Sequence, residues 1–237
     1  MPAFTTSFIG RETIARGTAS IELARPAGFG FTAGQAINLT LLEPRETDAK
    51  GNSRTFSIAS APSEPTLRIA TRMRDTAFKR VLGTLEPGSA VKLRGPMGKF
   101  TLPEDDSHPV AMLAGGIGIT PFMSMLREEE SRGSKRPRLL LYSNRSREDA
   151  PFLEALEAMA ERGAGFRLVA AMSDAGSGGG TSRGIADPEF LSQHLAGAGA
   201  CDHYLAGPPA MVGSLRKALA ALGIPEAAIR TDEFFGY

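Results

Sequence analysis

The pattern of apolar residues changes once along this chain of 237 residues. Up to about residue 102, short runs such as TLRIATRM (66–73) alternate apolar and polar side chains, which is the period of a half-buried strand. Several such runs, each stopped by Pro or Gly, predict a small antiparallel β-barrel. After residue 108, apolar strands alternate with helical segments. That alternation predicts βαβ units and a parallel sheet covered on both faces.

The segment LPEDDSHP (102–109) separates the two patterns with Pro and acidic residues. We therefore expect two domains, a barrel over residues 1–103 and an α/β domain over residues 104–237. Within the first, the apolar spacing of TAFKRVLGTL (76–85) predicts one short helix. Within the second, the Gly/Ser-rich segment 174–184 predicts a mobile loop.

Composition excludes several classes of protein. The net charge of +1 offers no concentrated basic face for nucleic acid. The single cysteine, Cys201, excludes an internal disulfide framework and a four-cysteine cluster, and the three histidines have no metal-ligand spacing. No apolar run reaches about 18 residues and no leader pattern is present, so we expect a cytoplasmic protein with no metal and no membrane partner.

The stretch MLAGGIGITPF (112–122) places glycines and a proline directly after an apolar strand. Glycines let the backbone turn sharply and approach a bulky anion. Thr120 can cap the helix that follows, and the free N–H groups of a helix start favour phosphate. On these residues alone, a pyrophosphate cradle and an ordinary strand-to-helix turn remain equally good interpretations.

Three further stretches accompany this one. In chain order they are RTFSIAS (54–60), GPMGKF (95–100) and, after the glycine-rich turn, YLAGPPAM (204–211). Together the four resemble the motifs RxYSxxS, GPxGxF, GGxGxTP and CGPPxM of the ferredoxin–NADP reductase superfamily. The resemblance runs over nearly the whole chain. It implies a flavin-binding barrel followed by a nicotinamide-nucleotide domain, with hydride transferred between them.

By this resemblance, RTFSIAS supplies the flavin site. Arg54 would pair with the flavin pyrophosphate, for which a guanidinium fork is suited, and Thr55 would lie beside it. Phe56 stands where the family usually has Tyr and would lie against the isoalloxazine ring. Ser57 would place its hydroxyl near the flavin N5. A surface position for Arg54 and plain strand packing for Phe56 and Ser57 are the alternatives.

The short helix predicted in TAFKRVL (76–82) begins where the family binds flavin phosphates. Arg72, Thr76 and Lys79 would contribute there, although a solvated charge on a helix is nearly as good an interpretation. The chain ends DEFFGY, which resembles the ExFG ending of some branches. Glu233 and Phe235 would then face the flavin from the side opposite Phe56. Tyr237 would cover the ring instead, or an aromatic residue would pack in the core.

The second domain would hold the nicotinamide nucleotide. The resemblance assigns its pyrophosphate to Gly116, Gly118 and Thr120, and the floor beside the nicotinamide to Gly207 and Pro208. Ala206 replaces the cysteine that the family often has before that glycine. This departure affects the expected rate more than the reaction type, because the flavin carries the chemistry.

The stretch YSNRSRED (142–149) ends the second predicted strand of this domain, where such folds meet the adenosine ribose. Arg145 and Arg147 are suited to a 2′-phosphate, and Ser143 can add a hydrogen bond. An acidic residue placed first would instead favour NADH. Glu148 and Asp149 follow, where they suit the start of a helix. The sequence therefore favours NADPH, with NADH as the alternative.

These features predict an FAD-dependent NAD(P)H oxidoreductase with Ser57 and Glu233 as catalytic residues. It would pass electrons singly to a separate acceptor, because the cysteines of a fused [2Fe–2S] module are missing. Candidate acceptors are a ferredoxin, a flavodoxin, an oxygenase component or a haem protein. The alternatives are a ferric-chelate or siderophore reductase and a non-catalytic flavin- or nucleotide-binding subunit of a larger complex.

Overall fold

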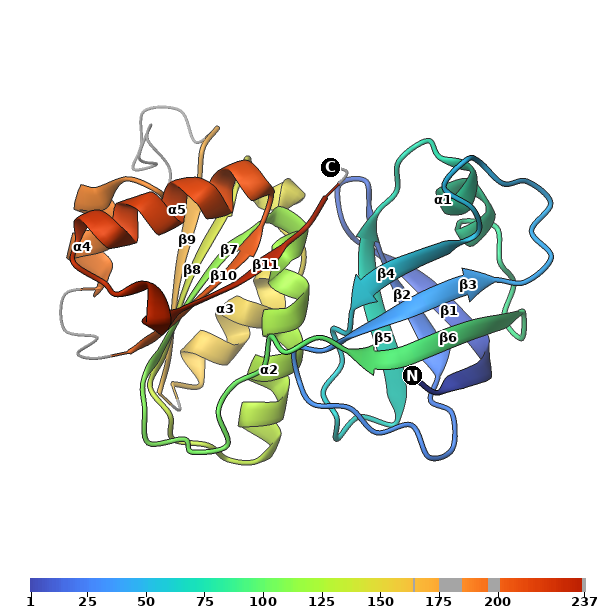
Figure 1. Ribbon diagram of the computed structural model, residues 1–237, viewed down its shortest axis with the longest axis horizontal. Helices are drawn as coiled ribbons and strands as arrows, with labels where there is room; N and C mark the ends of the chain where they lie inside the picture. Colours follow the sequence, from blue (N-terminus) through green and yellow to red (C-terminus); the bar gives the residue numbers. More distant parts are fainter. Residues whose placement is uncertain (164, 175–184, 196–200, 236–237) are drawn as a thin grey trace.

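The computed structural model describes residues 1–163, 165–174, 185–195 and 201–235. It has two lobes, an antiparallel one built from the first half of the chain and an α/β one built from the second (Figure 1). The fold class predicted from the sequence is confirmed. Most of the Gly/Ser-rich segment, residues 175–184, and Tyr237 lie outside the described residues.

The first lobe is a six-stranded antiparallel sheet in the order β4-β3-β6-β1-β2-β5. A bridge between Ile58 and Ile69 draws its two edges together, as closing a barrel requires. Inward side chains alternate with outward ones along the strands, and Leu39 and Leu93 are fully buried. The strands are β1 (Ala3–Ala15), β2 (Thr18–Ala24), β3 (Ala36–Leu41), β4 (Ser53–Ser57), β5 (Thr66–Arg72) and β6 (Ala90–Met97).

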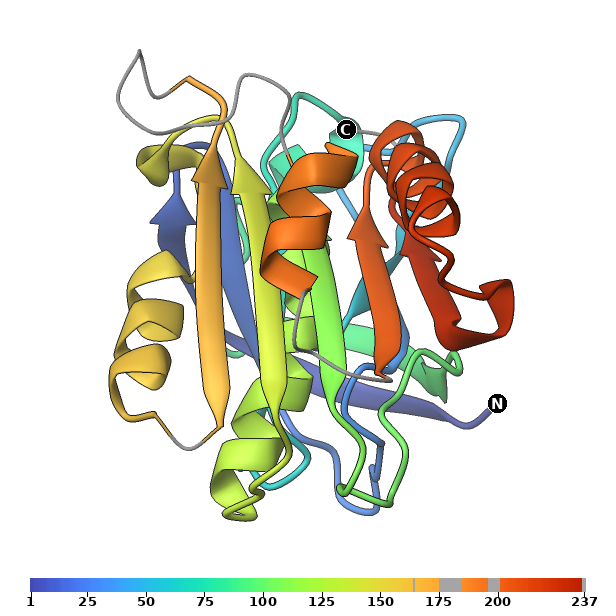
Figure 2. The same cartoon turned by 90° about the vertical axis from the view of Figure 1, so that its left-hand side faces the viewer.

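The second lobe is a five-stranded parallel sheet in the order β11-β10-β7-β8-β9. All its carboxyl ends meet at one edge, the upper edge in Figure 2. Every residue of β7 is buried, because helices cover both faces of the sheet. The strands are β7 (Val110–Gly115), β8 (Arg138–Asn144), β9 (Phe166–Met172), β10 (Asp202–Gly207) and β11 (Ile229–Glu233).

Helices α2 (Ile119–Ser131) and α3 (Leu153–Glu161) cover the face of this sheet that is turned toward the barrel. Helices α4 (Pro188–Leu195) and α5 (Pro209–Ala221) cover the other face (Figure 1). The short helix α1 (Ala77–Leu82) belongs to the barrel, and its predicted apolar face is buried. Within the described ranges, no helix combines the length and apolarity needed to cross a bilayer. The described residues also form the 3₁₀ turns η1 (Gly116–Gly118), η2 (Arg147–Asp149) and η3 (Glu226–Ala228).

Two helix starts differ from the sequence prediction. Helix α2 begins at Ile119, and the Thr120 hydroxyl donates to the Ile117 carbonyl at 2.7 Å, so Thr120 does not cap it. The predicted helix from Glu148 begins only at Leu153, because Phe152 has a left-handed φ of 62°. Glu148 and Asp149 lie in η2 instead of opening that helix.

Side chains from both lobes meet in one core. The Phe100 ring lies 5.6 Å from that of Phe122 and 5.4 Å from that of Tyr204, measured between centroids. The Ser124 hydroxyl of α2 donates to the Ser60 carbonyl of the barrel at 2.7 Å. The six-stranded sheet ends at Met97 and the parallel sheet begins at Val110, and a domain division at residue 103 within this interval stays a prediction.

We expect Phe100→Ala to lower the free energy of unfolding by about 3–5 kcal/mol, because it empties a buried site shared by both lobes. The denaturant midpoint measures this loss. Leu42→Ala is the matched control, since Leu42 is 42% exposed and its truncation should change stability by less than about 0.5 kcal/mol. Equal midpoints for the two variants would show that Phe100 does not contribute to stability in this way.

Candidate active site

A cavity of about 440 Å³ lies where the barrel meets the carboxyl edge of the parallel sheet. Its walls come from β4, β5 and α1 on one side, and from η1, α2, β11 and the residues after β11 on the other. This volume is typical of a ligand site. Ten of the residues predicted from the sequence line it: Arg54, Thr55, Phe56, Ser57, Arg72, Thr76, Lys79, Thr120, Glu233 and Phe235.

The lining contains two chemically distinct groups. The first is basic and comprises Lys50, Arg54, Arg72, Arg74 and Lys79. The second combines aromatic rings with a hydroxyl and carboxylates, and comprises Phe56, Ser57, Asp232, Glu233, Phe234 and Phe235. A ligand with an anionic part and a flat aromatic part matches both groups, since cations bind phosphate and ring faces stack.

Arg54 is held in place by its own loop. Its Nη1 donates to the carbonyls of Lys50 at 2.9 Å and Gly51 at 2.8 Å, and its Nη2 lies 3.2 Å from a carboxylate oxygen of Asp48. The guanidinium also lies 5.0 Å from the centre of the Phe78 ring. Arg54 therefore orders the loop before β4, and an anion in the cavity has to compete with Asp48 for it.

Phe56 is 8% exposed, with its ring 6.0 Å from that of Phe78. The Nζ atom of Lys79 lies 4.6 Å from the centre of the Phe56 ring and donates to the Thr71 hydroxyl. Loss of hydration, assisted by the positive charge of Arg54, lowers the pKa of Lys79 to about 7. A lysine amine therefore lies over the ring of Phe56, the residue predicted to stack on the flavin.

The carboxylate that meets Ser57 is that of Asp232. Ser57 Oγ donates to Asp232 Oδ2 at 3.5 Å, which joins β4 to β11 across 175 residues of sequence. Burial raises the pKa of Asp232, and the hydrogen bond from Ser57 opposes this in part. Glu233, predicted as a catalytic residue, lines the same cavity but is exposed, as is Phe235 at 79%.

Sequence reasoning missed Asp232 because the comparison with ExFG drew attention to Glu233. The strand period contained the signal. Alternate residues of a strand share a face, so Asp232 goes with Phe234, whose ring packs on the core between the lobes. Glu233 belongs to the opposite face.

The predicted glycines meet where β7 and β10 lie side by side. A Cβ on Gly118 would lie 2.3 Å from the Ala206 carbonyl oxygen, and one on Gly207 would lie 3.2 Å from the Gly115 nitrogen. Gly118 is therefore required for close packing of the turn on β10. Gly116 has a φ of 53°, and a Cβ there would lie 3.4 Å from the Arg72 guanidinium. Gly116 and Gly118 flank the cavity without lining it.

The strands on either side of β7 and β10 end at the same edge of the sheet. Ser143 of β8 pairs with Gly115, and Glu233 of β11 pairs with Gly207. Pro208 follows Gly207 and is the N-cap residue of α5. The chain leaves β7 toward β8, while β10 packs on the other side of β7. Such a topological switch point is where α/β sheets bind nucleotides.

The two candidate arginines after β8 have different surroundings. Arg147 forms a bidentate ion pair with Glu157 at 2.7 and 2.8 Å, so its fork is occupied. Arg145 is exposed and has no ion pair or side-chain hydrogen bond within the described ranges. The backbone N–H of Asp174 donates to the Arg145 carbonyl at 2.9 Å, which brings an acidic residue to the same corner.

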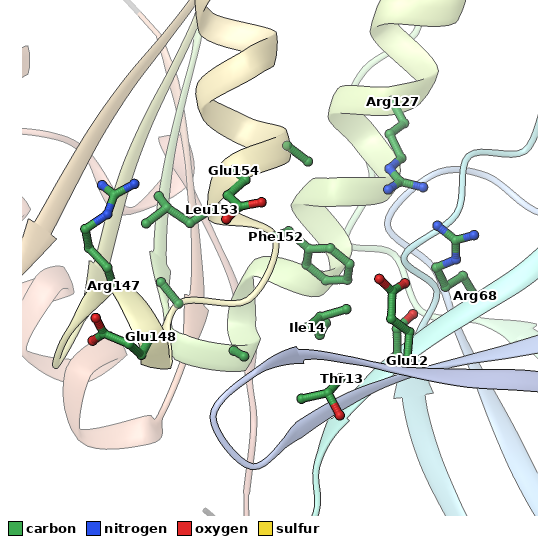
Figure 3. Close-up of a pocket in the computed structure, with 14 residues that line it drawn as sticks. Glu12, Thr13, Ile14, Arg68, Arg127, Arg147, Glu148, Phe152, Leu153 and Glu154 are labelled. Carbon is green, nitrogen blue, oxygen red and sulfur yellow. The ribbon is translucent and has the colours of Figure 1, made fainter.

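A larger cleft of about 570 Å³ lies between β1 and the start of α3 (Figure 3). Arg68 and Arg127 enter it from one side, with Phe152 and Ile14 between the lobes. Arg68 is paired with Glu22 at 3.6 Å and Arg127 with Glu64 at 3.2 Å. Because these charges are already compensated and none of the predicted flavin residues lines the cleft, it is not the candidate active site.

A barrel that presents basic and aromatic groups to the switch point of a parallel sheet defines a two-domain nucleotide-dependent oxidoreductase. A family model described as the oxidoreductase NAD-binding domain matches residues 112–217. Ferredoxin–NADP reductase B of Sorangium cellulosum is 33% identical over 224 residues, covering 91% of this chain and 90% of that protein. The chain therefore belongs to the ferredoxin–NADP reductase superfamily.

Two further similarities extend along the chain. The reductase component of propane 2-monooxygenase from Mycolicibacterium goodii is 26% identical, covering 97% of this chain and 67% of that protein. A ferredoxin NADP⁺ reductase from Neisseria gonorrhoeae, solved with bound FAD and NADP, superposes with a TM-score of 0.81 at 23% identity. The superposition covers 99% of this chain and 100% of the Neisseria chain, and the two have the same fold.

The pKa of Asp232 should lie above the ordinary Asp value of about 3.9, because burial disfavours its charged form. Ser57→Ala should raise this pKa further, since it removes the donor that stabilises the carboxylate. A pH titration of the ¹³C carboxyl resonances measures both values. A pKa below 3.9, or a decrease in Ser57→Ala, would place the Asp232 carboxylate in water.

Proposed function

We propose that this protein transfers hydride from NAD(P)H to FAD held in the cavity, and passes the electrons on singly to a separate redox protein. The observation that carries the proposal is the cavity itself. Ser57, Asp232 and Phe56 line it together with a basic group, directly beside the switch point of the nucleotide sheet. FAD supplies the chemistry when bound, because it accepts a hydride and releases electrons one at a time.

The residues present fit this cofactor. The basic group can neutralise a pyrophosphate, and Gly116, having no side chain, leaves the approach to Arg72 open. Phe56 and Phe234 offer aromatic surface to a flat ring system. Thr55, Thr76 and Thr120 add hydroxyls around the cavity.

The chain's own residues would orient the reactants. The Ser57 hydroxyl is held toward Asp232 Oδ2, which fixes the position of its Oγ in the cavity. Asp232 would accept this hydrogen bond from a buried position, where burial raises its pKa. Gly207 and Pro208 would shape the floor for the nicotinamide, where a Cβ on Gly207 would lie 2.5 Å from the Met211 methyl group.

The names of the relatives favour a protein acceptor. One is a ferredoxin–NADP reductase and another is the reductase component of an oxygenase, so we place a ferredoxin or an oxygenase component first. A flavodoxin or a haem protein comes next, and a ferric chelate is the rival acceptor. Ala206, in place of a cysteine, is the feature that favours a non-catalytic subunit. A cytoplasmic location stays a prediction.

The test is anaerobic reduction of the reconstituted protein. It should bind FAD, become reduced by NADPH or NADH in stopped-flow absorbance, and pass electrons to ferricyanide and then to one-electron redox proteins. A protein that binds no flavin after reconstitution would refute the proposal. A protein that binds FAD but is reduced by neither nucleotide would be the non-catalytic subunit.

Asp232→Asn should lower the rate constant of flavin reduction about a hundredfold, because loss of the carboxylate that accepts from Ser57 would displace the Ser57 hydroxyl. Glu233→Gln is the matched control and should cause a much smaller loss, because its exposed carboxylate is not the one at Ser57. Single-turnover stopped-flow measures both. A larger loss in Glu233→Gln would restore Glu233 as the catalytic residue.

Arg145 should discriminate NADPH from NADH through the 2′-phosphate. Arg145→Ala should lower kcat/KM for NADPH about ten- to hundredfold and leave that for NADH nearly unchanged. Asp174→Asn should act in the opposite direction, because it removes a like charge beside the phosphate. A wild type that prefers NADH, or equal losses for both nucleotides, would contradict this assignment and leave the flavin site untouched.

A further inference from the structure

Lys79 behaves unlike an ordinary helix-surface lysine. Its neighbours Ala77, Phe78, Val81 and Leu82 form the buried face of α1. The Lys79 side chain extends into the cavity beside this face instead of reaching solvent. Its Nζ donates to the Thr71 hydroxyl and lies over the Phe56 ring at 4.6 Å, with the Phe78 ring at 5.8 Å.

The charges around this amine are mostly positive. Arg54 of β4 shares the Phe78 ring with it and adds to the fall in its pKa. From β5 and the segment after it, Arg72 and Arg74 line the same cavity, and Lys50 enters from the loop before β4. Asp232 and Glu233 of β11 are the acidic residues of the lining. Within residues 1–163, 165–174, 185–195 and 201–235, no carboxylate forms a hydrogen bond or ion pair with the Lys79 amine.

The Lys79 amine has no anionic partner among the described residues. It is partly dehydrated, it has a hydroxyl and two aromatic rings for neighbours, and a guanidinium lies close by. Burial without a counter-charge favours the neutral amine. A dianionic group entering the cavity would reverse this balance, because it supplies the missing charge at short range.

We propose that Lys79 is a flavin-binding residue that takes up a proton from solvent when the pyrophosphate of FAD enters the cavity. This inference rests on the proposed function, since it requires FAD in that cavity. One N–H bond forms at Nζ, and the buffer acid loses that proton. Affinity for FAD is thereby coupled to pH through this single side chain.

The sign of the coupling follows from linkage. In the free protein the pKa of Lys79 lies at about 7, and bound pyrophosphate raises it. Below about pH 7 the amine is already charged in the free protein, so affinity is constant. Above about pH 7 each binding event must recruit a proton. The dissociation constant for FAD should then rise by up to about tenfold per pH unit until the pKa of the complex is reached.

Titration of the apoprotein with FAD between pH 6 and 9, followed by flavin fluorescence, measures this slope. Lys79→Gln should bind FAD about ten- to hundredfold more weakly at pH 6, with no slope. Lys79→Arg keeps a permanent charge and should bind FAD without a slope. Lys50→Gln, which removes an exposed cation of the same lining, should keep the slope. Calorimetry at pH 8 in buffers of different ionisation enthalpy should show proton uptake in the wild type and none in Lys79→Arg.

Asp232→Asn tests whether the acidic residue, and not the lysine, causes the pH dependence. This variant should keep the rise of the FAD dissociation constant with pH. Riboflavin, which lacks the pyrophosphate, should bind without a slope. A wild-type affinity that does not change with pH, or a slope that persists in Lys79→Gln, would overturn the role of Lys79 while FAD binding stands. A riboflavin slope equal to that of FAD would overturn the pyrophosphate as its cause. Failure of the wild type to bind FAD at any pH would refute the proposed function itself.

Discussion

The site depends on how closely β7 and β10 approach at their carboxyl ends. Gly118 allows this approach, because a Cβ there would lie 2.3 Å from the Ala206 carbonyl oxygen. Cβ atoms on Gly115 and Gly207 would instead lie 2.3 and 2.5 Å from the Met211 side chain of α5. The turn after β7 therefore starts α2 directly against β10, which brings Thr120 to the cavity. Since β11 lies beside β10, the same contact fixes where the last strand can meet the barrel.

Burial then sets the electrostatics of the cavity. It raises the pKa of Asp232 and lowers that of Lys79, so it disfavours the charged form of an acid and of a base in the same space. These are opposite shifts with one cause. Perturbed pKa values of this kind cluster at functional sites. The Asp232 carboxylate accepts from Ser57, and the Lys79 amine lies over the Phe56 ring.

The contact surface between the lobes gives this arrangement its stiffness. Phe100 packs on Phe122 and Tyr204, and Ser124 donates to the barrel backbone. Because both walls of the cavity are tied to this shared core, Ser57 and Asp232 keep their spacing although they come from different lobes. At the nucleotide edge, by contrast, Arg145 is exposed, so its contribution depends on a ligand charge and not on packing.

The sequence by itself determined the two-lobed architecture, since the change from period-two runs to alternating strands and helices reports local burial directly. Sequence reasoning also identified ten residues that line one cavity. Only the tertiary structure decided that Asp232 and not Glu233 meets Ser57, that Arg147 is occupied by Glu157, and that the Lys79 amine lies over Phe56. The contacts of Asp232 and Lys79 join segments that are distant in the chain, and that of Arg147 joins a 3₁₀ turn to the helix that follows it. Local sequence patterns indicate which face a residue occupies, as the strand period does for Asp232, but not which side chain lies opposite it.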